Sequence, residues 1–89
     1  MNIDNKNALL VQVAEIIGSS TGLEGCSRWS RETPLFGAIP ELDSQSLMVI
    51  MMALEERFEI QIETDDLSLE ALATLGAFTN LVEKKLQAT

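Results

Sequence analysis

The spacing of apolar residues between positions 44 and 58 constrains the fold more than any other feature of this chain. These residues recur at steps of three and four positions, at Leu47, Ile50, Met51, Leu54 and Phe58. Such steps place side chains on one side of an α-helix, so the segment predicts an amphipathic helix with an apolar stripe against a core. Asp43 precedes the segment and is a favoured residue type for a helix N-cap.

Ser44 follows this cap directly and is the first residue of the predicted helix. The first four backbone N–H groups of a helix lack partners within the helix, and the helix dipole is positive at that end. A phosphate ester on Ser44 would therefore lie in a favourable electrostatic field. The serine is a candidate attachment point, although an Asp-Ser pair before an apolar run can also serve only as a cap.

Three further helices are predicted, each opened by a residue that can cap it. Asp4 opens the first, which ends near Gly18; Thr64 opens a short one, which ends near Leu72; and Thr74 opens the last. No stretch alternates between apolar and polar residues for long enough to predict a strand. The sequence therefore predicts an all-α fold, a four-helix bundle with three longer helices and one short helix.

A long loop is predicted between the first two long helices, from residue 19 to residue 40. This stretch holds three of the five glycines and both prolines. Loops of this length inside a small domain are usually functional or disordered. We expect this one to be ordered, because Trp29, Leu35, Phe36 and Ile39 would otherwise expose much apolar surface.

Length and charge exclude several classes of function. A chain of 89 residues is expected to form one domain, residues 1–89, with a single modest core. Its 14 acidic and 6 basic residues give a net charge of −8, which argues against nucleic acid and anionic membranes and favours basic partners. The sequence shows neither a signal peptide nor an apolar run long enough to span a bilayer. We expect a cytoplasmic monomer that does not insert into membranes.

Catalytic and metal-binding residues are not evident. The chain has no histidine and no tyrosine, and Ser44 has no obvious group to accept its proton. Cys26 is the single cysteine, so the chain can form neither an internal disulfide nor a metal site with several cysteines. We predict that the protein is not an enzyme and has no metal site.

Two short motifs, at the two ends of the predicted helix, resemble those of a known family. Leu42, Asp43 and Ser44 stand at its start, and residues 53–58 read ALEERF at its end. Acyl carrier proteins have a D-S-L triplet and an A-L-E-E-x-F stretch at this spacing. The resemblance extends more weakly over nearly the whole chain, with a long loop between helices I and II. Ser46 lies in the same helical turn as Ser44, but only Ser44 follows an aspartate at the family's distance from the residues ALEE.

The resemblance implies both a prosthetic group and a function. Ser44 would receive 4′-phosphopantetheine from coenzyme A, and the terminal thiol of that arm would carry acyl groups as thioesters. Asp43 matches the acid beside the family's attachment site. The implied partners are a phosphopantetheinyl transferase and acyl-loading and acyl-using enzymes with basic or apolar docking patches, in fatty acid, lipid or specialised biosynthesis. Residues 34–44 also resemble carriers associated with exosortase and exopolysaccharide systems.

One set of residues near Ser44 is expected to bind these partners. The set is Gln45, Met48, Val49, Met52, Glu55 and Glu56. Gln45 replaces the family's leucine, and apolar residues stand where fatty acid synthase carriers have several acids. The two glutamates match the acidic end of the family's recognition helix, on its outer face. The methionines either line an acyl pocket, form a docking surface or belong to the core, since methionine adapts to many apolar shapes.

Two other functions remain open on the sequence alone. An aminoacyl or peptidyl carrier would use the same serine and differ only in its cargo. An unmodified helical adaptor would instead bind a partner helix through Met48, Val49 and Met52, without a prosthetic group.

Overall fold

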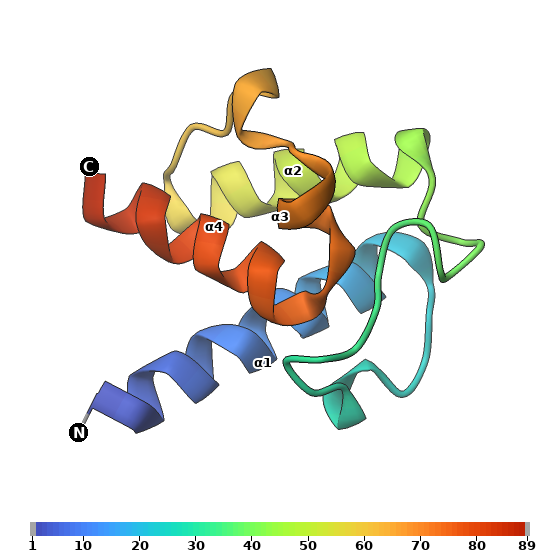
Figure 1. Cartoon of the computed structure of the whole chain (residues 1–89), viewed down its shortest axis with the longest axis horizontal. Coiled ribbons are helices and arrows are strands. Elements are labelled where there is room, and N and C mark those ends of the chain that lie inside the picture. The colour runs from blue at the N-terminus through green and yellow to red at the C-terminus, as the bar shows by residue number, and fades with distance from the viewer. Residues whose placement is uncertain (1, 89) are drawn as a thin grey trace.

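The computed structural model describes the backbone of residues 2–88 and the side chains of residues 8–26 and 28–87. It confirms the predicted all-α fold (Figure 1). The elements are α1 (Asn2–Thr21), the 3-10 turn η1 (Cys26–Arg28), α2 (Ser44–Phe58), the 3-10 turn η2 (Thr64–Asp66), α3 (Leu69–Ala73) and α4 (Leu75–Ala88). Within residues 2–88, the only β-type backbone pairing is an isolated bridge between Pro34 and Thr74.

The core lies where α1 meets α2 and α4, and α3 packs against α4. The largest fully buried side chains come from the three long helices and one loop position; they are Val13, Ile17, Leu35, Ile50, Leu54, Leu75, Phe78 and Val82. On α2, Ile50 and Leu54 are buried and Met51 and Phe58 pack against the same core. The apolar stripe predicted from residues 44–58 is therefore confirmed at these positions.

The first helix is longer than its predicted span. It begins at Asn2, so Asp4 lies inside the helix and is not its cap, and it continues through Gly18 to Thr21. Gly18 suits the helix because a Cβ there would lie 3.1 Å from the Sγ atom of Cys26, which packs on this turn. Gly22 follows the last residue of the helix and ends it, because its φ of 80° is readily adopted by glycine.

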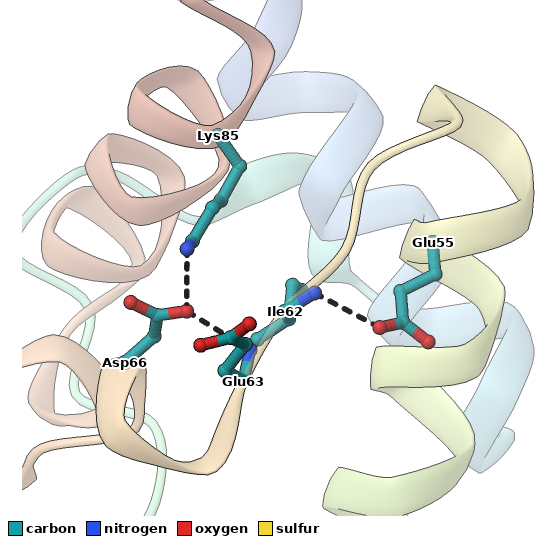
Figure 2. Close-up of polar contacts among 5 residues, drawn as sticks. All are labelled: Glu55, Ile62, Glu63, Asp66 and Lys85. Atoms are coloured by element: carbon teal, nitrogen blue, oxygen red, sulfur yellow. Dashed lines mark hydrogen bonds and ion pairs between the residues drawn. The ribbon is translucent and has the colours of Figure 1, made fainter. Parts of the chain in front are cut away.

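The short helix also differs from the prediction. A helix from Thr64 to Leu72 is wrong, because Thr64–Asp66 forms only a 3-10 turn and α3 begins at Leu69, capped by Ser68. The backbone N–H of Glu63 donates to the Asp66 carboxylate over 2.9 Å, and Lys85 on α4 forms an ion pair with the same carboxylate (Figure 2). These contacts stabilise the turn, and the non-helical backbone of Leu67, with φ of −94° and ψ of 64°, separates it from α3.

The start of α4 agrees with the prediction. The Oγ1 atom of Thr74 accepts a hydrogen bond from the backbone N–H of Ala77 over 3.2 Å. Thr74 therefore caps α4 as expected.

The loop between α1 and α2 is ordered by its apolar residues, as predicted. Leu35 is fully buried, and Trp29, Phe36 and Ile39 are partly buried against the core. Phe36 meets Phe78 of α4 edge to face, with 6.0 Å between the ring centroids. The chain ends lie on the left of Figure 1, whereas this loop and the start of α2 lie on the right.

Backbone contacts further attach this loop to the junction of α3 and α4. The backbone N–H of Leu35 donates to the carbonyl of Ala73 over 2.8 Å, and that of Gly76 donates to the carbonyl of Arg31 over 2.9 Å. A Cβ at position 76 would lie 2.9 Å from the same Arg31 oxygen, so only glycine allows this approach. The loop therefore holds the start of α2 at a fixed place on the bundle.

Candidate functional site

Ser44 is exposed at the first residue of α2, as the sequence predicts. Leu42 anchors the preceding chain in the core, and Asp43 adopts extended backbone angles and caps the helix. Its Oδ1 atom accepts a hydrogen bond from the backbone N–H of Ser46 over 2.9 Å. This bond lowers the pKa of the Asp43 carboxyl below its ordinary value.

The two serines in this turn have different surroundings. Ser46 is half-buried, and its Oγ atom donates to the carbonyl of Glu41 over 2.6 Å. Among the residues that the structure describes, no group forms a hydrogen bond with the Ser44 hydroxyl. The Ser44 oxygen is therefore the more accessible of the two to a modifying enzyme.

The surroundings of Ser44 fit a covalently attached phosphodiester. The hydroxyl projects from a helix N-terminus, where the partial positive charge of the backbone favours an anion. No acidic side chain lies within the first turn of α2 itself, although Asp43 precedes it. Because Ser44 is exposed, a long substituent can leave the surface without displacing the core.

Beside Ser44, α2 presents an apolar face to solvent. Met48, Val49 and Met52 have exposed fractions of 64%, 49% and 65%, respectively. Gln45 and Glu56 are exposed as well. We call these five residues the exposed α2 face. Its methionines neither belong to the core nor line an internal pocket, which leaves a surface role among the three possibilities that the sequence allowed.

Glu55 does not lie on this face, so its expected place on the outer side of the helix is wrong. Glu55 is half-buried, and its Oε2 atom accepts a hydrogen bond from the backbone N–H of Ile62 over 2.9 Å. In Figure 2, Glu55 on α2 and Lys85 on α4 reach the segment between these helices from opposite sides. Glu55 therefore positions the chain that leaves α2.

A groove borders the exposed α2 face on the side of α1. It is lined by Ile16 and Ser19 of α1 and by Met52, Ala53, Glu56 and Arg57 of α2. A second hollow, lined by Ala8, Leu9, Gln12, Phe58, Glu83 and Leu86, lies at the last residue of α2. Sequence reasoning missed both, because neither motifs nor periodicity reveal which helix packs beside α2.

Other kinds of site are not found in the described part of the chain. Cys26 is buried, and this burial raises the pKa of its thiol, which makes it less reactive. Among the described residues, no three His, Cys, Asp or Glu side chains gather in a manner that could hold a metal ion. No described helix is long and apolar enough to cross a membrane.

Comparison with known proteins identifies the class that this fold and site define. Residues 11–82 match the family described as "Phosphopantetheine attachment site". The structure is similar to the solution NMR structure of a holo acyl carrier protein from Nitrosomonas europaea, with a TM-score of 0.79 and 35% sequence identity. That alignment covers 88% of this chain and 95% of the other. The comparison with curated proteins gives no match.

The chain belongs to the acyl carrier protein family. It is a carrier and not an enzyme, and its prosthetic group is phosphopantetheine. In such a protein the chain supplies position and recognition, and the prosthetic group supplies the chemistry.

Proposed function

We propose that Ser44 is the attachment residue and that the protein carries acyl groups as thioesters on 4′-phosphopantetheine. A phosphopantetheinyl transferase would join the Ser44 oxygen to the phosphorus of the arm and break the diphosphate of coenzyme A, with adenosine 3′,5′-bisphosphate as the leaving group. The observation that carries the proposal is the exposed, unbonded hydroxyl of Ser44 at the capped start of α2. The bound arm supplies a thiol that exchanges acyl groups between enzymes of fatty acid, lipid or specialised biosynthesis.

The chain contributes position rather than catalysis to this modification. Asp43 fixes the first turn of α2, and the helix N-terminus favours the negative charge of the phosphodiester. The chain contains no histidine, and within its described residues no side chain forms a hydrogen bond with the Ser44 hydroxyl. The base that removes the hydroxyl proton must therefore come from the transferase.

The exposed α2 face is the proposed docking surface for the transferase and the acyl-handling enzymes. Met48, Val49 and Met52 offer apolar contacts, whereas Glu56 offers a charge to a basic patch. Flexible methionines can fit several apolar partners in turn. A carrier that visits different enzymes needs such adaptability.

An intact-mass measurement tests the proposal. Incubation with coenzyme A and a broad-specificity transferase should add the mass of one phosphopantetheine to the parent and to Ser46→Ala, but none to Ser44→Ala. Ser46→Ala is the matched control, because it removes the other hydroxyl of the same turn. A parent chain that gains no mass would point to the unmodified adaptor, and a gain by Ser44→Ala would overturn the assignment of Ser44.

The cargo needs a separate measurement, because an aminoacyl or peptidyl carrier would use the same serine. Protein isolated from the cells that produce it can be treated with hydroxylamine, which cleaves thioesters and releases the cargo as a hydroxamate. We expect fatty or other acyl hydroxamates, identified by mass. Amino acid hydroxamates would support the aminoacyl carrier instead. The exosortase or exopolysaccharide association, the cytoplasmic location and the monomeric state stay predictions from the sequence.

A further inference from the structure

The groove between α1 and α2 lies within reach of an arm on Ser44. From Ser44 to Met52 the helix rises about 12 Å, and to Glu56 about 18 Å. Phosphopantetheine spans about thirteen bonds from phosphorus to sulfur, and three extended bonds cover roughly 3.5 Å, so the arm reaches roughly 15 Å. Its sulfur therefore passes the level of Met52, and an acyl chain on the sulfur extends to Glu56; both residues line the groove. Phe58 in the second hollow lies about 21 Å along the helix, so the sulfur does not reach it and only the end of an acyl chain could.

An apolar path connects the serine to the groove. Ser44, Met48 and Met52 are spaced by four residues, so each lies about 40° around the helix from the one before it. This rotation takes successive side chains from the side of α2 that bears Ser44 toward the side that borders α1, where Met52 lines the groove. Met48 and Met52 have 64% and 65% of their surface in solvent, respectively. A ligand lying along them would remove apolar surface from water.

The groove offers both apolar and polar contacts, which matches the chemistry of the arm. Met52, Ala53 and Ile16 provide apolar surface to an acyl chain. Glu56 can accept a hydrogen bond from an amide N–H, and Arg57 can donate to an amide carbonyl. Both side chains are exposed, and neither has a partner among the described residues. Long side chains on a helix lean toward its N-terminus, which brings both groups nearer the distal amide of pantetheine.

We propose that the α1–α2 groove is a surface resting site for the distal pantetheine and its thioester cargo. This inference rests on the proposed attachment to Ser44. Because the exposed α2 face is also the proposed docking surface, the bound arm would cover Met48 and Met52 between partner encounters. A docking enzyme would displace the arm from these residues and receive the cargo beside its own binding surface.

Methyl and amide NMR signals test this proposal directly. The protein is labelled at its methionine methyl groups and its backbone nitrogen, and apo, holo and octanoyl forms are compared. We expect octanoylation to shift the methyl signal of Met52 and the amide signals of Ile16 and Ser19. Met51 serves as the internal control, because it precedes Met52 on the same helix but packs against the core, so its methyl signal should move least.

A pair of exposed variants provides the matched comparison. Met52→Gln should remove most of the shift at Ile16 and Ser19, because it replaces an apolar wall of the groove. Val11→Gln changes an exposed apolar residue of α1 that neither lines the groove nor belongs to the exposed α2 face, and it should leave the shifts as they are in the parent. Circular dichroism of both variants checks that the helices are retained.

The possible outcomes separate this inference from the proposed function. A mass spectrum that shows no arm on Ser44 refutes the proposed function. If the octanoyl arm is present but the shifts fall on Met51 and buried core residues, the cargo lies inside the bundle and the resting site is wrong. If the arm is present and no protein signal moves, the cargo stays in solvent, which also overturns the inference.

Discussion

At the scale of single residues, Glu55 and Glu56 are adjacent in α2 but have different roles. Glu56 is exposed beside the groove, whereas Glu55 is half-buried and accepts the hydrogen bond from the backbone N–H of Ile62. Neighbouring residues point about 100° apart on a helix, so they meet different surroundings. One glutamate therefore stabilises the fold, and the other is free to meet a partner.

Removal of each carboxylate should reveal this difference. Glu55→Ala leaves the N–H of Ile62, a buried residue, without its acceptor and should lower the free energy of unfolding by about 1–3 kcal/mol. Glu56→Ala removes an exposed group and should change it by no more than about 0.5 kcal/mol. Urea unfolding followed by circular dichroism measures both. Equal losses in the two variants would contradict the role given to Glu55.

Asp66 makes part of the stability dependent on pH. Its ion pair with Lys85 lowers the pKa of the Asp66 carboxyl below its ordinary value. A carboxyl with a lowered folded-state pKa stabilises the protein above its unfolded pKa of about 3.9, and this contribution is lost as the pH falls through the folded-state value. As the pH is lowered below about 4, the urea midpoint should therefore fall less steeply in Asp66→Asn than in the parent. Parallel curves would contradict this contribution.

At the scale of elements, local sequence patterns predicted the existence of the helices better than their first and last residues. The stripe of α2 and the caps Asp43 and Thr74 depend on residues close in sequence, so they were predicted correctly. The start of α3 was not, because the turn before it is closed partly by Lys85 from α4. No local pattern reveals a contact between residues so far apart in the chain.

The same distinction applies to the candidate site. Ser44 and its cap are local features, and the sequence placed both at the start of α2. The hydrogen bond from Ser46 to Glu41 and the groove beside α1 depend on how the loop and α1 pack, so the sequence could not reveal them. Glu55 was misplaced for a similar reason, because its partner Ile62 lies beyond the end of the helix.

The exposed α2 face should affect partner association rather than folding. Glu56→Lys should slow loading by the transferase at low salt, if the transferase presents a basic patch, and the effect should shrink as salt rises. The variant should melt nearly as the parent does, because Glu56 is exposed. Leu54→Ala is the contrasting change: it removes a fully buried side chain and should cost about 2–5 kcal/mol.

A loading time course at two salt concentrations, together with a thermal melt, tests this prediction. An unchanged loading rate for Glu56→Lys at low salt would place recognition elsewhere, with Met48, Val49 and Met52 as the next candidates. Glu56 is a better probe than Glu55, because a change at Glu55 also disturbs the segment after α2.

At the scale of the whole molecule, charge repulsion opposes the compact fold. The net charge of −8 is spread over a small chain, and like charges on a compact protein repel one another. Added sodium chloride screens this repulsion, so it should raise the thermal midpoint near neutral pH. A series of melts through the physiological salt range measures the effect. A midpoint that falls steadily with salt would show that self-repulsion is not a significant term.

The central claim is that Ser44 alone receives phosphopantetheine, and peptide mass spectrometry tests it most directly. Trypsin cleaves after Arg31 and Arg57, which releases residues 32–57 with Ser44 and Ser46 as the only serines of the peptide. After loading from coenzyme A, fragmentation of this peptide should place the added mass on Ser44. Fragments that place it on Ser46 or on Thr33 would contradict the claim.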